Sequence, residues 1–485
     1  MAVGPTIAMH SPLVVLGGGP GGYAAAFLAA DLGISVTIVE ADPRLGGTCL
    51  LRGCIPSKAL LHVAKIVNEA QELTEWGIDL GKPAVRIDAL RARKEKVITT
   101  LSGGLKQLAK QRKVRVINAK GVFQNSSTLK LEGGDPATYS EGNTLTFDHC
   151  ILATGSLPTK IPAFDLRTDR VMDSTGALEL RDVPESLLVV GGGYIGLEMG
   201  TVYCELGTAV SVVELTDGLL PGADRDLVKP LQSRLEKHFK AIHLGTKVVS
   251  LTDKGDSIEV AFEGPQGPRT ERYSRVLVSV GRKPNSQGIG LENTKVVVDK
   301  RGFVGIDKQQ KTADPHIMAI GDVAGEPMLA HKAAHEGKVA VEVLHGEPAV
   351  FDALAIPAVV FTDPEIAWTG LTENQAKQEG REVEIAKYPW AASGRAQALG
   401  RTEGLTKLVI DPETERVLGV GIVGTSAGDL VAEATLAIEM GCDVHDLVHT
   451  IHAHPTLSET IAFAGEAYLG LATEIYRPKR ERQEA

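Results

Sequence analysis

Two glycine-rich stretches of this chain carry the same pattern at the same spacing. An apolar run leads into GGGPGG, which begins at Gly17, and another leads into GGGYIG, which begins at Gly191. In each copy a second apolar run follows and ends in a glutamate, Glu40 or Glu214. Gly191 follows Gly17 by 174 residues, and Glu214 follows Glu40 by the same distance. Agreement over this length indicates two copies of one strand–loop–helix–strand unit.

Each glycine in the pattern has its own physical task. The first permits a tight turn, the second lets the backbone approach a pyrophosphate, and the third lets the helix pack on the strand. A carboxylate at the end of the second strand can accept hydrogen bonds from ribose hydroxyls. One such motif alone is weak evidence for nucleotide binding, but two copies predict two dinucleotide-binding βαβ units. A protein that holds two dinucleotides side by side most economically passes electrons between them. The residues are Gly17, Gly19, Gly22 and Glu40 in the first unit, and Gly191, Gly193, Gly196 and Glu214 in the second.

The segment GGTCLLRGCIPSK, from Gly46 to Lys58, carries two cysteines, Cys49 and Cys54, before an apolar-periodic stretch. That periodicity predicts a helix beginning near the pair, and a helix N-terminus lowers the pKa of a thiol. The spacing differs from the two-residue gap of a zinc knuckle, and no second Cys or His pair lies nearby. From the spacing alone, two buried and unreactive cysteines are as good an explanation as a reactive pair. The dinucleotide motifs on either side favour a redox-active pair.

A further candidate cluster is HAHPTLSE, which begins at His452. His454 and Glu459 flank a proline turn, so the carboxylate can orient an imidazole that acts as a general base. From the motif alone, the alternative that His454 is an ordinary surface histidine near a helix start is not excluded. Metal binding is disfavoured because His452 and His454 lack carboxylate or cysteine companions. It is also disfavoured at His331 and His335, where no metalloprotease glutamate follows the first histidine.

Length and composition bound the remaining possibilities. The 485 residues suggest about three domains, and 43% hydrophobic with 23% charged residues is typical of a soluble globular protein. The net charge of -10 argues against nucleic acid or an anionic membrane surface as the main partner. Five cysteines in a chain this long do not form a secreted disulfide framework. Cys150, Cys204 and Cys442 are therefore interpreted as packing residues in a reducing compartment.

No segment is interpreted as a membrane span or a targeting signal. The uncharged run Pro12–Ala30 is long enough, but it holds five glycines and two prolines, and no Lys or Arg precedes it. A strand, a turn and a helix explain it better, and a cytoplasmic location is expected.

Helical sequence is expected between the two glycine-rich units. It runs from Val85 to about Lys113, with a break at Gly103-Gly104. From about Pro357 further strands and an Ala-rich helix form a C-terminal unit with no glycine fingerprint. The charged tail at residues 477–485 is expected to fray.

Seven motifs make the whole chain resemble the flavin-dependent pyridine nucleotide-disulfide oxidoreductases. In the family's order they are GGGPGG at Gly17, GGTCLLRGCIPSK at Gly46, ATGS at Ala153, GGGYIGLEMG at Gly191, GRKPN at Gly281, AIGDVAG at Ala319 and HAHPTLSE at His452. The resemblance implies an α/β fold with two Rossmann-like dinucleotide-binding domains and a C-terminal α+β dimerisation domain. The implied domains are an FAD-binding domain at 1–157, an NAD-binding domain at 158–282, a central domain completing the FAD site at 283–355 and an interface domain at 356–485.

The resemblance also implies roles for single residues. Cys54 would be the flavin-side thiol that forms a charge-transfer complex, and Cys49 the interchange thiol facing the substrate. His454, oriented by Glu459, would be the base and would reach the disulfide of the other subunit. The residues implied to hold FAD are Gly17, Gly19, Gly22, Glu40, Gly155, Asp322 and Lys58 with its partner Glu198. Those implied to hold NAD are Gly191, Gly193, Gly196, Glu214 and Gly281.

The activity implied by the resemblance is oxidation of protein-bound dihydrolipoamide to lipoamide with reduction of NAD+, through the disulfide and FAD. The implied partners are a second copy of the chain in a homodimer, and the lipoyl domains and core acyltransferase of 2-oxo acid dehydrogenase complexes, or the lipoyl protein of glycine cleavage. Mercuric-ion reduction would require a cysteine pair near the C-terminus, and no cysteine follows Cys442. Glutathione reduction would require arginines for NADPH and for glutathione carboxylates. A catalytically silent dinucleotide-binding scaffold is the alternative from another class.

Two positions depart from the family pattern. Leu51 and Arg52 stand where Asn-Val is usual, and Arg52 adds a cation near the cysteine pair that would favour a thiolate. Tyr194 is an aromatic residue of the kind that gates the nicotinamide pocket in glutathione reductases.

Overall fold

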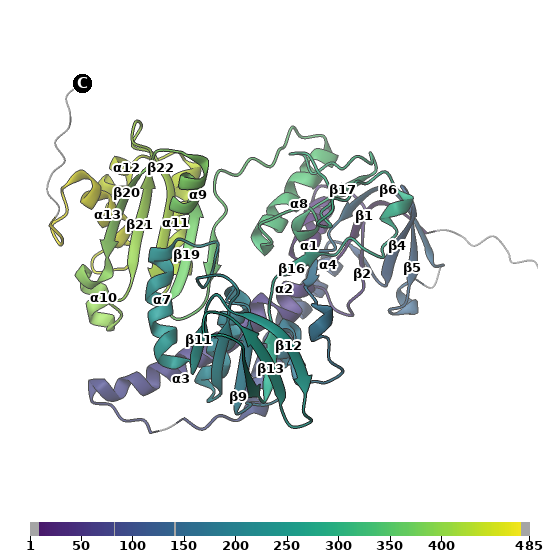
Figure 1. Ribbon diagram of the computed structural model, residues 1–485. Coiled ribbons are helices and arrows are strands. Elements are labelled where there is room, and N and C mark those ends of the chain that lie inside the picture. Colours follow the sequence, from purple (N-terminus) through teal and green to yellow (C-terminus); the bar gives the residue numbers. More distant parts are fainter. Residues whose placement is uncertain (1–8, 82, 140–141, 477–485) are drawn as a thin grey trace, which may run out of the picture.

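The computed structural model describes residues 9–81, 83–139 and 142–476. In Figure 1 the chain forms three lobes, one at the right, one at the bottom and one at the left. Each lobe is built around a main sheet of its own. The charged tail at 477–485, expected to fray, lies outside the described residues.

The right-hand lobe contains a seven-stranded sheet in the order β3-β2-β1-β6-β5-β4, with β17 also paired to β6. β1 runs parallel to both β2 and β6, and its last four residues are buried. An uninterrupted apolar run such as Leu13–Leu16 is typical of a central parallel strand, which is covered on both faces. The bounds are β1 Met9–Leu16, β2 Val36–Glu40, β3 Arg115–Asn118, β4 Lys120–Asn125, β5 Thr128–Glu132, β6 Thr144–Leu152 and β17 Ile317–Ala319.

Helices from distant parts of the sequence cover this sheet. α1 packs on α8, and the contact is close because both helices have a glycine there. A Cβ added to Gly337 would lie 2.7 Å from the carbonyl oxygen of Gly21. The bounds are α1 Pro20–Asp31, α2 Gly47–Arg52, α3 Cys54–Glu72, α4 Ile87–Gln111 and α8 Ala330–His345.

The expected break in the helical sequence before residue 113 is wrong. α4 runs without interruption through Gly103 and Gly104. Both glycines are exposed, and a Cβ at either would meet nothing within 4 Å, so neither marks a turn or a close approach. Beside them the Ser102 hydroxyl donates to the carbonyl of Leu45 at 3.0 Å, and buried apolar residues anchor the helix on both sides. Tertiary packing outweighs the low helix propensity of two glycines.

The lower lobe repeats the same unit. Its five-stranded parallel sheet has the order β11-β10-β9-β15-β8, and α6 follows β9 as α1 follows β1. A three-stranded antiparallel sheet, β12-β13-β14, belongs to the same lobe. The strand bounds are β8 Val171–Met172, β9 Ser186–Val190, β10 Ala209–Val213, β11 Ala241–His243, β12 Lys247–Asp253, β13 Ile258–Glu263, β14 Arg269–Tyr273 and β15 Arg275–Val278. The helices are α5 Ser174–Glu179, α6 Tyr194–Glu205 and α7 Arg225–His238.

The left-hand lobe is a five-stranded antiparallel sheet with helices packed on it. The strand order is β18-β19-β22-β21-β20, and α11 packs on β22 and β19 while α13 packs on β20 and β21. Trp390 is fully buried in this lobe, and its Nε1 donates to Thr406 Oγ1 at 2.9 Å. The strands are β18 Ala358–Val360, β19 Glu365–Gly370, β20 Glu384–Pro389, β21 Leu405–Ile410 and β22 Val417–Gly424. The helices are α9 Glu373–Glu379, α10 Gly394–Leu399, α11 Ala427–Glu439, α12 Val444–His449 and α13 Glu459–Leu469.

These lobes confirm the predicted fold class of two Rossmann-like units and a C-terminal α+β unit. The boundaries at 157, 282 and 355 stay predictions. Strands β7 (Ser156–Pro158) and β16 (Arg282–Pro284) pair antiparallel at the first two of them.

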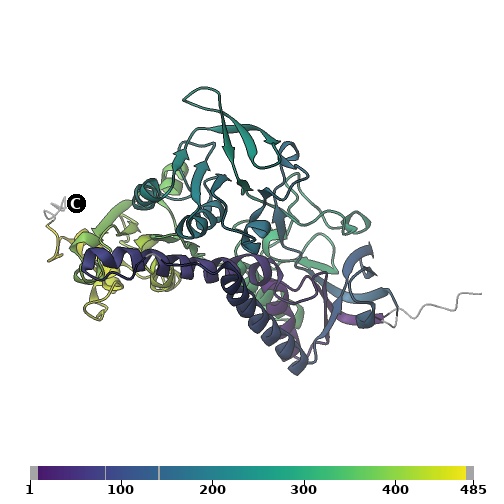
Figure 2. The same ribbon diagram turned by 90° about the horizontal axis from the view of Figure 1, so that it is seen from below.

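Helix α3 connects the cysteine segment with the C-terminal lobe. It begins at Cys54, and Figure 2 shows its far end lying against that lobe. Lys65 Nζ donates to Thr425 Oγ1 at 3.0 Å, and the ring of Trp76, just beyond the helix, lies against Gly400. The position of the cysteine segment is therefore fixed relative to both the right-hand and the left-hand lobe.

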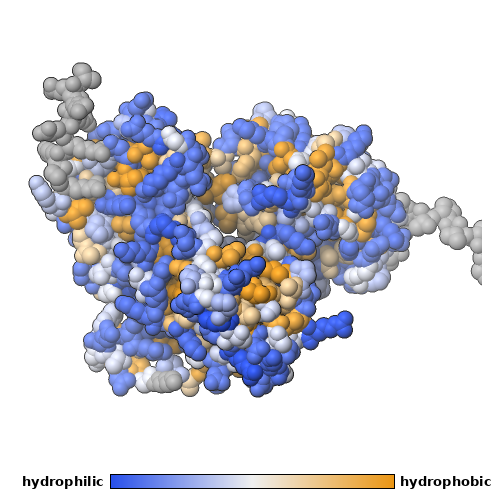
Figure 3. All heavy atoms as spheres, in the orientation of Figure 1, coloured by the Kyte–Doolittle hydropathy of each residue, from blue (hydrophilic) through white to orange (hydrophobic). Residues whose placement is uncertain are grey.

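Hydrophilic residues dominate the face shown in Figure 3, with apolar residues in scattered patches. The long helices α3 and α4 are amphipathic and carry many charged residues. Across the described ranges, no helix combines the length and the apolar character needed to cross a membrane.

Candidate active site

One cavity of about 490 Å³ is lined by residues of both the right-hand and the lower lobe. The first glycine loop, the cysteine segment and the start of α6 all contribute to its wall. The residues predicted from sequence that line it are Gly17, Gly19, Glu40, Cys49, Cys54, Lys58, Gly155, Glu198 and Asp322. The fold thus brings together both cysteines and most of the residues expected around the flavin.

The cysteine pair lies where two helices meet. α2 ends at Arg52 and α3 begins at Cys54, so that thiol lies in the first turn of a 19-residue helix. Gly53 between them has no room for a side chain, since a Cβ would lie 2.8 Å from the carbonyl oxygen of Thr48. Both cysteines are free thiols, and Cys54 is exposed to the cavity. A thiolate in the first turn interacts favourably with the helix dipole.

The two thiols differ in their ionisation. A hydrogen bond from Cys49 and the charge of the Lys58 ammonium lower the pKa of Cys54 to about 7, against the opposing effect of burial. The same hydrogen bond, together with partial burial, raises the pKa of Cys49. In the reduced protein Cys54 is therefore the thiol that ionises first, while Cys49 keeps its proton.

Lys58 is held beside Cys54 by Glu198 of α6. Its Nζ donates to both carboxylate oxygens, at 2.9 and 2.8 Å. Glu198 is buried and also accepts from Ser57 Oγ at 2.8 Å and from the backbone amide of Phe361 at 3.1 Å. The ammonium also lies 4.5 Å from the centroid of the Phe361 ring. Residues from three lobes therefore fix the position of this positive charge.

The lowered pKa predicts a spectral titration. In the two-electron-reduced enzyme, the long-wavelength absorbance of a thiolate next to the flavin should fade as the pH falls through about 7, because Cys54 becomes protonated. Lys58→Met removes a charge that favours the thiolate, so the midpoint should move to higher pH. Absorbance spectra across the pH range measure both midpoints. A band of constant intensity from about pH 5 to 9 would show that no thiol titrates there.

Another part of the cavity wall is built around Asp322. Its Oδ2 accepts from Ser156 Oγ at 2.5 Å, and Arg282 Nε donates to the same hydroxyl at 2.7 Å. The preceding amide, of Gly321, donates to Glu336 Oε2 at 2.6 Å. Asp322 is thus supported by side chains from three other segments.

Glu336 and Lys332 form a buried pair that the sequence interpretation missed. Their Nζ and Oε1 atoms are 2.6 Å apart, and both side chains are almost inaccessible to solvent. The signal was present, because these two residues have opposite charges at i, i+4 on α8. The histidines at positions 331 and 335, with the same spacing, were considered instead. His331 Nε2 lies 2.8 Å from the carbonyl oxygen of Pro357, and the ring of His335 packs edge-on against Phe351.

The first glycine loop suits the pyrophosphate of FAD. Gly17 has φ +114°, and a Cβ there would lie 2.3 Å from the carbonyl oxygen of Ala153. Gly22 is packed still more closely, because a Cβ would lie 1.9 Å from the carbonyl oxygen of Gly17. Helix α1 begins after Gly19 with no side-chain cap and no acidic residue in its first turn. Its free backbone amides are therefore available to an anion such as the pyrophosphate, with no side chain competing for them.

The second loop repeats this geometry outside the cavity. Gly191 has φ +105°, and a Cβ on Gly196 would lie 2.4 Å from the carbonyl oxygen of Gly191. Helix α6 begins after Gly193, again without a side-chain cap. Tyr194 and Glu198, from the first turns of α6, line the FAD-side cavity. The second loop therefore lies beside the cavity, directly before these lining residues.

The two strand-end carboxylates make the same backbone contacts. Glu40 Oε2 accepts from the amide of Gly18 at 2.6 Å, and its Oε1 accepts from Asp42 at 2.8 Å. Glu214 Oε2 accepts from Gly192 at 2.6 Å, and its Oε1 accepts from Thr216 at 2.8 Å. Burial raises the pKa of Glu40. Each carboxylate therefore lies against its glycine loop, where a ribose would be bound.

His454 and Glu459 lie together, away from the cysteine pair. His454 Nδ1 is 3.2 Å from Glu459 Oε2, and the imidazole is 75% exposed whereas the carboxylate is 4% exposed. His454 is not among the described residues that line the cavity. Its neighbour His452 is 8% exposed and has both ring nitrogens occupied, by Glu433 at 2.6 Å and by the carbonyl of Thr450 at 2.8 Å. Of the two histidines, only His454 presents a ring nitrogen to the solvent.

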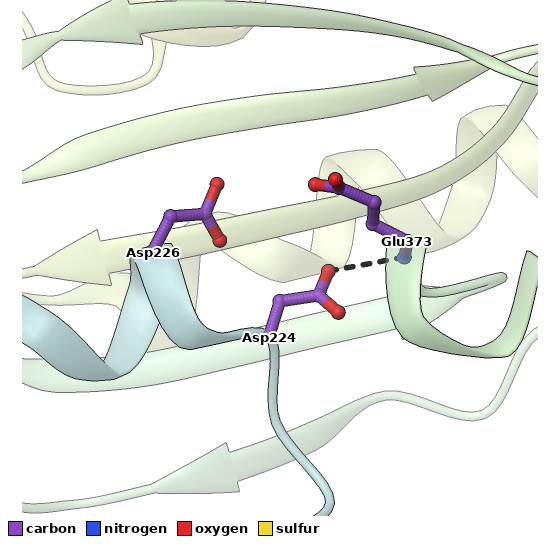
Figure 4. Close-up of side chains that lie close together, drawn as sticks. All are labelled: Asp224, Asp226 and Glu373. Carbon is purple, nitrogen blue, oxygen red and sulfur yellow. Dashed lines mark hydrogen bonds between the residues drawn. The ribbon is translucent and has the colours of Figure 1, made fainter. Parts of the chain in front are cut away.

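Within the described ranges, one group of three carboxylates is close enough to share a cation: Asp224, Asp226 and Glu373 (Figure 4). Asp224 caps the start of α9, accepting from the amide of Glu373 at 3.1 Å. The ammonium of Lys407 already lies among them, 2.6 Å from Asp224, 2.8 Å from Asp226 and 3.4 Å from Glu373. Since Lys407 is itself fully buried, the cluster is an interlobe ion-pair network.

The two unusual positions both line the cavity. Arg52 forms an ion pair with Asp42, two residues beyond Glu40. The cation that lowers the pKa of Cys54 is Lys58. Burial raises the pKa of Tyr194 to about 12, so its phenol stays protonated at neutral pH.

A thiol pair and a fixed lysine in a cavity lined by one dinucleotide loop, with a second such loop beside it, define a nucleotide-dependent thiol–disulfide oxidoreductase. Residues 11–337 match the family model for pyridine nucleotide-disulphide oxidoreductases, and residues 356–464 match the model for their dimerisation domain. The chain belongs to the pyridine nucleotide-disulphide oxidoreductase family.

Relatives similar over their whole length are named dihydrolipoyl dehydrogenase. The protein from Vibrio cholerae is 50% identical over 98% of this chain and 99% of its own. The protein from Geobacillus stearothermophilus is 42% identical over 98% and 99%. Among solved structures, LpdA from Mycobacterium tuberculosis has a TM-score of 0.86 at 26% identity, covering 95% of this chain and 100% of its own. The HOCl-induced flavoprotein disulfide reductase RclA from Escherichia coli has a TM-score of 0.81 at 26% identity, covering 93% and 98%.

Proposed function

We propose that this chain oxidises the dihydrolipoyl group of a carrier protein to the cyclic disulfide and reduces NAD+. The observation that carries the proposal is the Cys54 thiolate, fixed beside Lys58 in a cavity that both nucleotide-binding lobes line. The full-length relatives named dihydrolipoyl dehydrogenase support the substrate class.

In this proposal Cys49 and Cys54 exchange electrons with the substrate. His454 of one subunit removes a proton from a substrate thiol, and the resulting thiolate attacks Cys49 in the Cys49–Cys54 disulfide. The protein S–S bond breaks, and Cys54 leaves as a thiolate. The second substrate thiol then attacks the mixed disulfide, which releases the lipoyl disulfide and leaves Cys49 reduced. Two electrons pass from the substrate dithiol to the protein disulfide.

The chain's own residues stabilise the products of this exchange. Lys58 and the Cys49 hydrogen bond stabilise the Cys54 thiolate, and Glu198 keeps Lys58 in place. Glu459 orients the imidazole of His454 through Nδ1, so that Nε2 exchanges the proton. FAD, when bound, supplies the two-electron redox chemistry that connects the thiols with NAD+.

The remaining assignments are part of the same proposal. The residues that would hold FAD are Gly17, Gly19, Gly22, Glu40, Gly155 and Asp322, and those that would hold NAD are Gly191, Gly193, Gly196, Glu214 and Gly281. The match of residues 356–464 to the family's dimerisation domain supports a homodimer. Lipoyl domains and the core acyltransferase of 2-oxo acid dehydrogenase complexes, or the lipoyl protein of glycine cleavage, are the proposed carriers, in the cytoplasm.

A comparison of two thiol substrates, dihydrolipoamide and reduced glutathione, tests the function. The purified protein should reduce NAD+ with dihydrolipoamide and should do so far more slowly with reduced glutathione, which lacks a second thiol in the same molecule to close the exchange. NADH formation, followed by absorbance, measures both rates. Glutathione-dependent turnover equal to that with dihydrolipoamide would reject the assignment.

Glu214 predicts a preference for NAD+ over NADP+. A 2′-phosphate at the ribose would meet this carboxylate, and one like-charge contact at ~4 Å with an effective dielectric near 20 costs roughly 4 kcal/mol before screening. Wild type should therefore have a much higher kcat/KM for NAD+, and Glu214→Gln should narrow the ratio. Asp217→Asn, the same charge change at an exposed position three residues on, is the control and should leave the ratio unchanged. Equal efficiency of wild type with both nucleotides would contradict this role.

A further inference from the structure

Four basic side chains line the cavity in the described part of the chain. They are Arg52, Lys58, Lys120 and Arg282. Lys58 is bound to Glu198 beside the thiols, and Arg282 donates to Ser156 beside Asp322. Both are therefore engaged by side chains other than those that would bind the adenosine ribose.

Arg52 contacts the nucleotide-binding loop after β2 instead. Its guanidinium pairs with Asp42, and its charge also acts on Glu40, which is the carboxylate proposed to bind the adenosine ribose. Asp42 is itself fixed, because its carbonyl oxygen accepts from Asn118 Nδ2 at 2.7 Å and its amide donates to Glu40. A charged side chain from α2, the helix that carries Cys49, thus reaches the nucleotide-binding loop after β2.

We propose that Arg52 binds the adenosine half of FAD and that Asp42 holds its guanidinium in position. The inference rests on the proposed use of FAD. Arginine recognises phosphate oxygens through paired N–H groups and stacks on aromatic rings, and adenosine diphosphate offers both. Among the described residues, the ion pair with Asp42 uses Nη2, which leaves Nε and Nη1 as donors for a ligand.

The balance of charges around Glu40 also supports a contact between Arg52 and the ligand. Glu40 and Asp42 place two carboxylates where an anionic pyrophosphate must also be bound. The amides at the start of α1 offset part of that charge. Arg52 offsets one of these carboxylates, and it lines the cavity in which the adenosine half would lie.

The test uses holoenzyme and the release of its flavin. Arg52→Gln should release FAD about tenfold faster or more than wild type, because a charge-assisted hydrogen bond is lost. The readout is the rise of free FAD fluorescence after dilution. Arg44→Gln is the matched control: Arg44 is similarly exposed, pairs with Glu95 at 2.7 Å and does not line the cavity, so release should stay at the wild-type rate. Arg52→Met keeps the aliphatic stem of the side chain and serves as the second variant if Gln impairs folding.

Three results would overturn the proposal: wild-type release from both Arg52 variants, equal acceleration in Arg44→Gln, or a shifted thiolate titration midpoint in Arg52→Gln with unchanged release. The last would assign Arg52 to the thiols. Flavin release is measured without substrate. A wild-type protein that holds FAD but does not oxidise dihydrolipoamide would therefore reject the proposed function and leave the Arg52 result standing.

Discussion

Cys54→Ser should abolish turnover of dihydrolipoamide, lowering kcat by roughly 10³-fold or more, because a serine cannot leave as a thiolate or form the protein disulfide. The variant should also lose the long-wavelength absorbance of the reduced enzyme, since the thiolate that carries the low pKa is gone. Steady-state NADH formation and spectra of the partly reduced enzyme measure the two effects. The protein should remain yellow, because the flavin-binding loops are untouched.

Two matched variants sharpen this result. Cys49→Ser should be equally inactive yet retain the long-wavelength band, because Cys54 is still present to ionise. Cys442→Ser changes a thiol in the C-terminal lobe, outside the cavity lining, and should leave activity unchanged. A Cys54→Ser protein with full dihydrolipoamide activity would remove the cysteine pair from the mechanism.

The second large effect is complementation between subunits. Mixing inactive Cys49→Ser chains with inactive His454→Gln chains should restore activity once subunits exchange, to about half of wild type per heterodimer. In such a dimer one site carries both defects and the other carries neither, if the base of each site comes from the opposite chain. The exposed imidazole of His454, away from its own chain's thiols, motivates the prediction. Activity after subunit exchange, with heterodimers quantified by two affinity tags, is the measurement.

The control mixes two variants that damage the same part of the site. Cys49→Ser chains combined with Cys54→Ser chains leave one defective thiol in every site, so no activity should return. If Cys49→Ser and His454→Gln heterodimers form and stay inactive, the base acts within its own chain.

Local patterns in the sequence were sufficient for the nucleotide-binding units. The uninterrupted apolar run before Gly17 and the glycines after it fix a buried strand and a tight turn, because these requirements depend on neighbouring residues alone. The helix behind Cys54 followed from apolar periodicity in the same way. The resemblance to the flavin-dependent family then joined these pieces into one fold class.

Contacts between distant segments could not be predicted in this way. Glu336 supports the amide of Gly321 from a helix that lies later in the chain, and nothing next to either residue indicates the other. Arg52 was interpreted from its position beside the cysteines, whereas its partner is Asp42 on the other side of the loop. The helix break predicted at the glycine pair in α4 was wrong for the converse reason. The low helix propensity of the glycines was outweighed by packing with distant residues, which the sequence does not display.

The contacts of Glu214 have a consequence for the redesign of nucleotide preference. The same carboxylate that would repel a 2′-phosphate also accepts from the amides of Gly192 and Thr216. Specificity and the shape of the loop are thus encoded in one side chain. A replacement by arginine would remove two acceptors while adding the desired charge. An engineer seeking an NADP-dependent variant therefore needs two changes, a new cation on a neighbouring residue and a neutral side chain such as glutamine at position 214, whose single amide oxygen keeps one of the two acceptors.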